Sequence, residues 1–108
     1  MDLHNVKVEE CRNNGVLVTR GANVVATDCQ FHHNKSDGVL ACSGAVVDLM
    51  GEGTSVHDNE QHGLSAVSRG TTINVYQPCV LNDMSHGNKG QNIFEYAGGT
   101  VQQKDSKK

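Results

Sequence analysis

Histidine and carboxylate side chains gather in the middle of this chain, where they could perform acid–base chemistry or bind a divalent metal. The residues with this potential are His32, His33, Asp37, His57, Asp58, Glu60 and His62. If short strands stack here, imidazoles and carboxylates come within one strand spacing of each other. Our catalytic candidates are His33, Asp58, Asp37 and His62, although the set matches no recognised motif. The simpler interpretation is that these side chains are solvated beside a bend, so we expect no metal site.

The elements that must position these residues form a repeat. Four similar runs cover residues 15–21, 38–44, 63–70 and 92–98, and their first residues are 23, 25 and 29 positions apart. A second set of runs begins with an apolar residue and alternates with period two, which is typical of a strand with one buried face. Each run of a third set begins with a small or apolar residue and ends with an asparagine. Three such rows in every repeat predict a coil of three short strands.

Stacking these coils in parallel, at about 4.8 Å, places like residues on like residues. We expect three inward ladders, formed by Val16, Val39, Leu64 and Ile93, by Val6, Val24, Val47 and Ile73, and by Cys11, Phe31, Val56 and Cys79. We also expect an asparagine ladder at a bend, formed by Asn14, Asn34, Asn59 and Asn82. Asparagine suits such a bend because its amide can bond the next coil and its backbone tolerates the left-handed conformation.

These rows resemble the right-handed parallel β-helix repeats of the pectate-lyase-like superfamily, whose units have the form N-x-x-x-G-[VIL]-x-[VA]-x-x-G-[AT]. The resemblance covers about residues 6–103. It implies an all-β fold, a right-handed parallel β-helix (solenoid) of about four to five coils with three short strands per coil. We assign residues 1–103 to this single domain and residues 104–108 to a polar, flexible tail. Similar repeats occur in polysaccharide lyases, epimerases, phage tailspikes and recognition domains, so the resemblance implies little about function.

Three features depart from the repeat. Met1 leads almost directly into a strand, with no helix to cap the first coil, so we expect a piece of a longer protein. A longer excursion is expected at residues 83–91, in the fourth coil. Glu95 falls on an inward position, where an unpaired carboxylate is costly. Either the last coil is open to water there, or the register flips so that Phe94 and Tyr96 are buried.

An outward row of apolar residues carries our functional prediction. Leu17, Leu40, Val67, Phe94 and Tyr96 would form an exposed strip, and such strips mark partner surfaces. We therefore predict a non-catalytic recognition or scaffold module that binds a protein or an oligosaccharide on an exposed sheet. Two simpler interpretations stay open: another segment covers the strip, or these are ordinary single apolar residues.

The alternative function is a carbohydrate-active enzyme resembling a polysaccharide lyase, hydrolase or epimerase, or a fragment of one. It would use the cluster of His33, Asp58, Asp37 and His62. Calcium is expected only under this alternative, and otherwise we expect no cofactor. Enzymes of the superfamily present paired Asp residues beside a basic residue, whereas no basic residue stands beside Asp48 here. We therefore favour the non-catalytic interpretation.

Composition limits the partners. The 108 residues include 9 Lys and Arg against 12 Asp and Glu, giving a formal net charge of −3. Nucleic-acid binding needs a basic stripe, which three scattered arginines do not form, so we expect no nucleic-acid partner. No stretch approaches the roughly 18 to 20 apolar residues that span a bilayer, and the first residues lack the pattern of a secretion signal. We expect a soluble chain with no membrane contact, whose compartment these features do not determine.

The cysteines and the coil ends complete the expectations. Cys11, Cys29, Cys42 and Cys79 form no zinc-binding spacing and sit in or beside apolar runs, so buried free thiols are expected. A disulfide between stacked coils remains an alternative. The open ends of a solenoid also allow self-association from one copy to the next.

Overall fold

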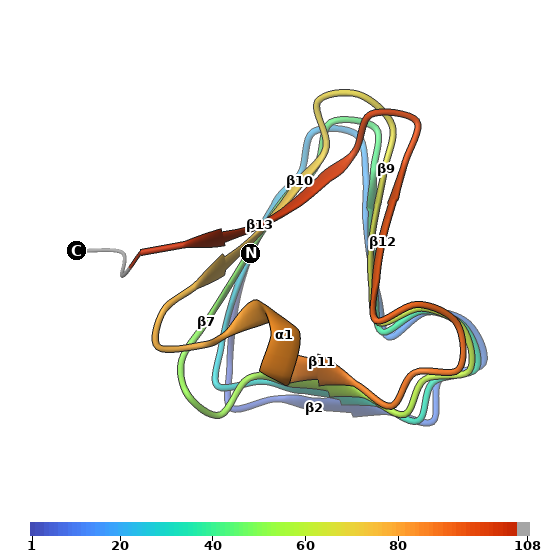
Figure 1. Ribbon diagram of the computed structural model, residues 1–108, viewed down its shortest axis with the longest axis vertical. Coiled ribbons are helices and arrows are strands. Elements are labelled where there is room, and N and C mark those ends of the chain that lie inside the picture. Colours follow the sequence, from blue (N-terminus) through green and yellow to red (C-terminus); the bar gives the residue numbers. More distant parts are fainter. Residues whose placement is uncertain (106–108) are drawn as a thin grey trace.

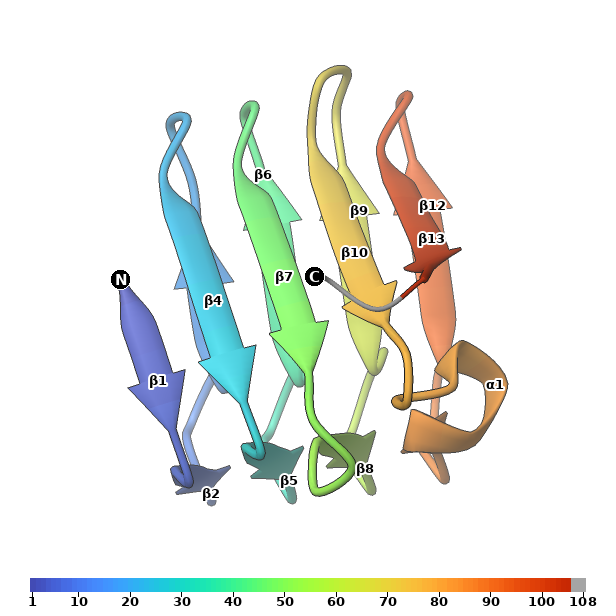
Figure 2. The same cartoon turned by 90° about the vertical axis from the view of Figure 1, so that its left-hand side faces the viewer.

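In the computed structural model, which describes residues 1–105, the chain winds into a solenoid of about four turns with a roughly triangular outline (Figure 1). Every strand pairing is parallel, and strands from successive turns lie side by side (Figure 2). The predicted all-β parallel solenoid, with three strands per coil, is confirmed. Its helical content within the described residues is one short helix, α1 (Leu81–Met84).

Three sheets form the sides of the triangle. The first sheet contains β1 (Asp2–His4), β4 (Asn23–Thr27), β7 (Val46–Met50), β10 (Thr72–Tyr76) and β13 (Thr100–Lys104). The second sheet contains β2 (Lys7–Glu9), β5 (Gln30–His32), β8 (Ser55–His57) and β11 (Ser85–His86). The third sheet contains β3 (Val16–Val18), β6 (Val39–Cys42), β9 (Leu64–Val67) and β12 (Ile93–Tyr96).

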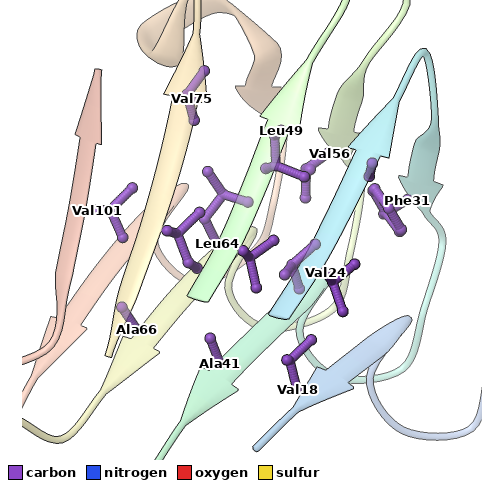
Figure 3. Packing of buried hydrophobic residues seen from close by; sticks show 14 of the residues in the cluster. Val18, Val24, Phe31, Ala41, Leu49, Val56, Leu64, Ala66, Val75 and Val101 are labelled. Atoms are coloured by element: carbon purple, nitrogen blue, oxygen red, sulfur yellow. The ribbon is translucent and has the colours of Figure 1, made fainter. Parts of the chain in front are cut away.

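The core is a narrow column of small and medium apolar side chains, contributed by all three sheets (Figure 3). Alternate residues of each strand point inward, as in β7, where Val47 and Leu49 are buried between half-buried neighbours. Leu64 and Ile73 are completely buried, and Phe31 fills the column from the second sheet. Burial of each such side chain contributes roughly 1.5–3 kcal/mol relative to exposure. The column therefore stabilises the stack although each coil is thin.

The inward ladder of the third sheet has the predicted register, in which Val39 pairs with Val16 and Leu64. In the first sheet, Val47 pairs with Val24 and Ile73 as predicted. The placement of Val6 in that ladder was wrong. The chain begins the first sheet earlier, with β1, whose single apolar residue Leu3 leaves little alternation to detect.

The second-sheet ladder runs through Val8, Phe31, Val56 and Ser85, so the expected positions of Cys11 and Cys79 were wrong. Cys11 lies at the corner after β2, where its backbone N–H donates to Oδ1 of Asn34 (3.1 Å). For Cys79, the reason is a difference in connection length. Residues 51–54 connect β7 to β8, whereas residues 77–84, including α1, connect β10 to β11. The long excursion thus precedes β11. Of residues 83–91, where it was expected, Asp83 and Met84 belong to it, and residues 85–91 hold regular parts of the coil. All four cysteines are free thiols, and Cys29 and Cys79 are buried.

An asparagine ladder is present, with different members. The backbone N–H of Asn34 donates to Oδ1 of Asn59 (3.1 Å), and that of Asn59 donates to Oδ1 of Asn88 (3.0 Å). The side-chain amides continue the row, with Nδ2–Oδ1 distances of 2.9 Å and 2.8 Å. Asn14 and Asn82 lie outside this ladder, so their assignment to it was wrong. The ladder closes the corner between the second and third sheets.

The last described coil keeps the register of the others. Glu95 pairs with Ala66 in the inward row, while Phe94 and Tyr96 point outward. Glu95 is exposed, and its Oε2 accepts a hydrogen bond from the backbone N–H of Val101 (2.7 Å). Of the two alternatives for Glu95, the coil open to water is the one observed. Lys104, assigned to the tail, is the last residue of β13, and residues 106–108 of that tail lie outside the described residues.

We predict that Asn59→Ala destabilises the fold by about 3 kcal/mol, because the buried N–H of Asn34 loses its acceptor and the amide ladder is broken. Urea unfolding followed by circular dichroism measures this loss. Asn82→Ala is the matched control, since Asn82 is exposed in α1 and its loss should change stability by less than about 0.5 kcal/mol. Equal losses in both variants would contradict the observed ladder.

Candidate functional site

Three histidines form a column on the outer side of the second sheet. Strand pairing places His57 between His32 and His86, and the row begins with Glu9. The ring centroids of His32 and His57 are 4.8 Å apart with planes at 2°, and those of His57 and His86 are 5.2 Å apart at 4°. The imidazoles are thus stacked face to face at the spacing of the strands.

A left-handed residue follows the strand in each of the first three coils, and in the second and third coils its side chain contacts this column. Glu10, His33 and Asp58 have φ of 58°, 56° and 55°. Nδ1 of His33 lies 2.6 Å from Nδ1 of His32, so one ring donates and the other accepts. Nδ1 of His57 lies 2.8 Å from Oδ2 of Asp58. This hydrogen bond is the main reason that the pKa of Asp58 is lowered, and Asp58 is an anion at neutral pH.

A shallow groove of about 630 Å³ runs beside the column, along the corner between the second and third sheets. Its lining carries both signs of charge. The lining residues are Glu10, His33, Lys35, Asp58, Glu60, Gly87 and Lys89. Lys35 and Glu60 form an ion pair, with Nζ 3.3 Å from Oε2. Gly87 fits closely, since a Cβ there would lie 2.7 Å from Oδ1 of Asp58.

Asp37 and His62 do not line this groove. They belong to a second polar ladder, in which Oδ1 of Asn14 accepts from the N–H of Asp37 (3.1 Å) and Oδ1 of Asp37 accepts from the N–H of His62 (2.9 Å). Nδ1 of His62 accepts in turn from the N–H of Gln91 (2.9 Å). The expected proximity of Asp37 and His62 is therefore present, but both side chains serve backbone groups. The structure separates the four catalytic candidates into two pairs.

The chemistry open to the groove is limited by these contacts. Asp58 is an anion that can attract a cation or accept a proton, and His33 is the neighbouring titratable group. Among residues 1–105, no group of three or more His, Cys, Asp or Glu side chains is arranged to hold a metal ion. In the same part of the chain, no helix is long and apolar enough to cross a membrane.

The five residues of the predicted strip all lie on the outer side of the third sheet, and we call Leu17, Leu40, Val67, Phe94 and Tyr96 the third-sheet face. Leu17 is 57% exposed and Tyr96 is 63% exposed, and the other three are half-buried. The face extends over all four strands of the sheet, and its members carry no charge.

Two residues outside the predicted strip contact this face. The ring of His62 stacks on Phe94 at 4.2 Å and 3°, and Phe94 is stacked with Tyr96 at 6.0 Å, so three rings form a row. Ser65 pairs with Leu40 and Phe94, and its buried Oγ has no hydrogen-bond partner among the described residues. The position of Ser65 on this face was predictable from the sequence, since Ser65 aligns with Leu40 in the strand register. The ring contact of His62 depends on the corner geometry and left no signal in the sequence.

Comparison with known protein families identifies the family that has this architecture. Residues 1–80 match the family model of the right-handed β-helix region. The chain belongs to the right-handed β-helix family. Neither the curated proteins nor the solved structures gave a match. In this right-handed β-helix, the matched residues include the first three coils with His32, His33, His57 and Asp58, and family membership establishes the fold without assigning a function to them.

The histidine column should make the stability of this right-handed β-helix depend on pH. Burial lowers the pKa of His32 below its ordinary value of 6.5, and the charge of a protonated His57 lowers it further, while Glu9 opposes the shift. His33 and Lys7 act in the same direction as His57. The unfolded chain therefore takes up this proton first, and stability falls as pH falls from 6.5 to the folded pKa.

We expect His32→Gln to flatten the dependence of melting temperature on pH between about 7.5 and 5, because glutamine does not titrate. Calorimetric scans at several pH values measure this slope. His4→Gln is the control, because His4 is an exposed histidine of β1 outside the column, and the original slope should remain. An unchanged slope in His32→Gln would show that His32 is not the responsible group.

Proposed function

We propose that this protein is a non-catalytic recognition or scaffold module that binds a protein or a glycan over the third-sheet face. The observation that carries the proposal is that apolar side chains occupy the outer side of all four adjacent strands, from Leu17 at one side to Phe94 and Tyr96 at the other. Apolar residues gathered on one outer face are typical of interaction surfaces. Covering them removes apolar area from water, which contributes roughly 25 cal/mol per Å².

The other two outer surfaces support this choice by contrast. On the first sheet, Nδ2 of Asn74 donates to Oδ1 of Asp48 (2.9 Å), and Nε2 of Gln102 donates to Oδ1 of Asn74 (2.8 Å). That row satisfies its own hydrogen-bonding groups. The second sheet presents the histidine column. The third-sheet face is therefore the surface with most to gain from an apolar contact.

The chemistry of the face suggests what a partner presents. Its members are uncharged, so a partner must offer apolar or neutral groups instead of an ion cluster. Phe94 has His62 on one side and Tyr96 on the other, whereas Tyr96 is largely exposed. A neutral sugar ring could stack on Tyr96, and an apolar protein segment could cover the whole row.

A carbohydrate-active enzyme is the second candidate, and the groove is the observation that favours it. Glu10, Asp58 and Glu60 line this groove together with His33, which are residue types used in sugar cleavage. Asp58 is held ionised by His57, so it could act as a base or nucleophile but not as the acid that protonates a leaving group. Calcium would be a ligand only in this second candidate.

The experiment measures melting temperature against a panel of neutral and acidic oligosaccharides, each with and without calcium, since a tight ligand raises the melting point. Protein partners are sought in parallel by crosslinking from a photoreactive residue placed at position 17. We expect Leu40→Lys to leave the fold intact, because the lysine stem can cover the same surface, and to weaken binding at least about tenfold.

Val25→Lys is the matched control, because Val25 is a half-buried valine on the outer side of the first sheet and its replacement should leave binding unchanged. Unfolding of Leu40→Lys would show that Leu40 is a core residue. If a ligand binds Leu40→Lys normally but is lost in Asp58→Asn, the functional site is the groove and the proposal fails. Catalytic turnover that survives Asp58→Ala would remove the groove from the enzymatic interpretation.

A further inference from the structure

The second polar ladder, at the corner between the second and third sheets, joins successive coils through one side chain of each coil. Asn14, Asp37 and His62 occupy the equivalent position in the first three coils, and each accepts a hydrogen bond from a backbone N–H of the following coil. The donors are the N–H groups of Asp37, His62 and Gln91, at 3.1, 2.9 and 2.9 Å. Three different kinds of acceptor therefore make the same contact.

These acceptors respond differently to protonation. The amide of Asn14 does not titrate, and a carboxyl group such as that of Asp37 still has an acceptor oxygen when it is protonated. An imidazole differs, because both nitrogens of its protonated form carry hydrogen and neither accepts. Histidine is also the side chain whose charge ordinarily changes between pH 5 and 8. The contact between His62 and Gln91 is therefore the one of these three that a moderate fall in pH can break.

The backbone of the fourth coil lies directly against this ring nitrogen. A Cβ at Gly90 would lie 2.7 Å from Nδ1 of His62, so a larger residue there would push the ring away. The N–H of Gly90 donates to the carbonyl of Gln61 (2.6 Å), which holds the fourth coil in this position. Because Nδ1 accepts from Gln91, the hydrogen of the neutral ring is on Nε2. A second hydrogen on Nδ1 would meet the N–H of Gln91, and the ring would have to move.

The charged groups around His62 lie on three coils. From the second coil, Asp37 touches residue 62 through the hydrogen bond from its backbone N–H. The fourth coil contacts the ring with uncharged groups, which belong to Gly90, Gln91 and Phe94. The other ionisable side chains close to these residues in the chain are Glu60, Lys89 and Tyr96, and all three are exposed. The imidazole is therefore the titratable side chain at the contact with Gln91.

The same ring supports the third-sheet face. The ring of His62 stacks on Phe94, with centroids 4.2 Å apart and planes at 3°, and Phe94 stacks in turn with Tyr96. His62 thus contacts the fourth coil twice, accepting from Gln91 with its edge and supporting Phe94 with its face. A ring that moves away from Gln91 also leaves one side of Phe94 without its stacking partner.

We propose that His62 is a pH-sensitive switch that regulates the third-sheet face. Above about pH 7.5 the neutral ring accepts from Gln91 and completes the aromatic row with Phe94 and Tyr96. Below about pH 5.5 the protonated ring releases Gln91, the row breaks up, and the face binds an apolar or neutral partner less tightly. The effect on binding rests on the proposed function of the face, whereas the movement of the ring does not.

NMR of the full 108-residue chain between pH 8 and 5 tests the movement. We expect the exchange protection of the Gln91 amide, relative to its intrinsic rate at each pH, to fall at least about tenfold, as for the loss of one hydrogen bond. The resonances of the Phe94 ring should shift with the midpoint of the His62 titration. Protection of Gln91 that does not change with pH overturns the proposal.

His62→Asn is the matched variant, because Asn14 makes the equivalent contact without titrating. Its Gln91 protection should be the same at pH 8 and pH 5, and a pH response that persists in this variant contradicts the proposal. His32→Gln is a second control, since His32 stacks in the histidine column and the Gln91 response should remain. Loss of the Gln91 response in His32→Gln would assign the switch to the column instead.

Neutral oligosaccharides, titrated at pH 7.5 and pH 5.5, separate the switch from the proposed function. Binding that is at least about tenfold weaker at pH 5.5, but equal at both pH values in His62→Asn, supports regulation of the face. Binding that is equal at both pH values in the original chain overturns the regulation and leaves the proposed function standing. A ring that moves as expected in a chain that binds none of these sugars supports the switch and counts against a glycan as the partner.

Discussion

The structure depends on how the corners of each coil satisfy their backbone hydrogen bonds. A chain that bends sharply between short strands exposes N–H groups, and a buried N–H without an acceptor costs about 1–3 kcal/mol. Asn34, Asn59 and Asn88 supply acceptors at one position of the corner between the second and third sheets. Asn14 and Asp37 supply them a few residues later. These side chains bind each coil to the next and hold the strands in register.

Once the register is set, like side chains must stack on the outer surfaces as well as in the core. The spacing that aligns Val39 with Leu64 also places His32 directly beside His57. Parallel stacking therefore concentrates each kind of chemistry on its own face of the triangle. The histidine column, the amide row of the first sheet and the apolar third-sheet face are consequences of the same constraint.

The four catalytic candidates fall into two pairs, according to whether the side chain accepts a hydrogen bond from a backbone group. Asp37 and His62 accept hydrogen bonds from the next coil, so their polarity is explained by the fold. His33 and Asp58 occupy left-handed positions outside the core and face the groove, where their side chains are available to solvent and ligands. In a solenoid of this kind, a titratable residue is a functional candidate when no backbone group of a neighbouring coil needs it as a hydrogen-bond acceptor.

The sequence by itself determined that the chain forms a coil of stacked strands. Runs bounded by glycine and the period-two alternation of apolar residues remain recognisable even though the repeat length varies. Val16, Val39, Leu64 and Ile93 could be aligned since each follows the same turn. It could not determine the coil position of Val6, Cys11 or Asn82, because a short apolar run fits any of three sheets and connection lengths vary. Only the tertiary structure, in which α1 lengthens one connection, decided that Asn88 joins the asparagine ladder. The physical reason is that the register is selected by hydrogen bonds that satisfy backbone groups between neighbouring coils. The two partners of each such bond lie a full turn apart in the sequence.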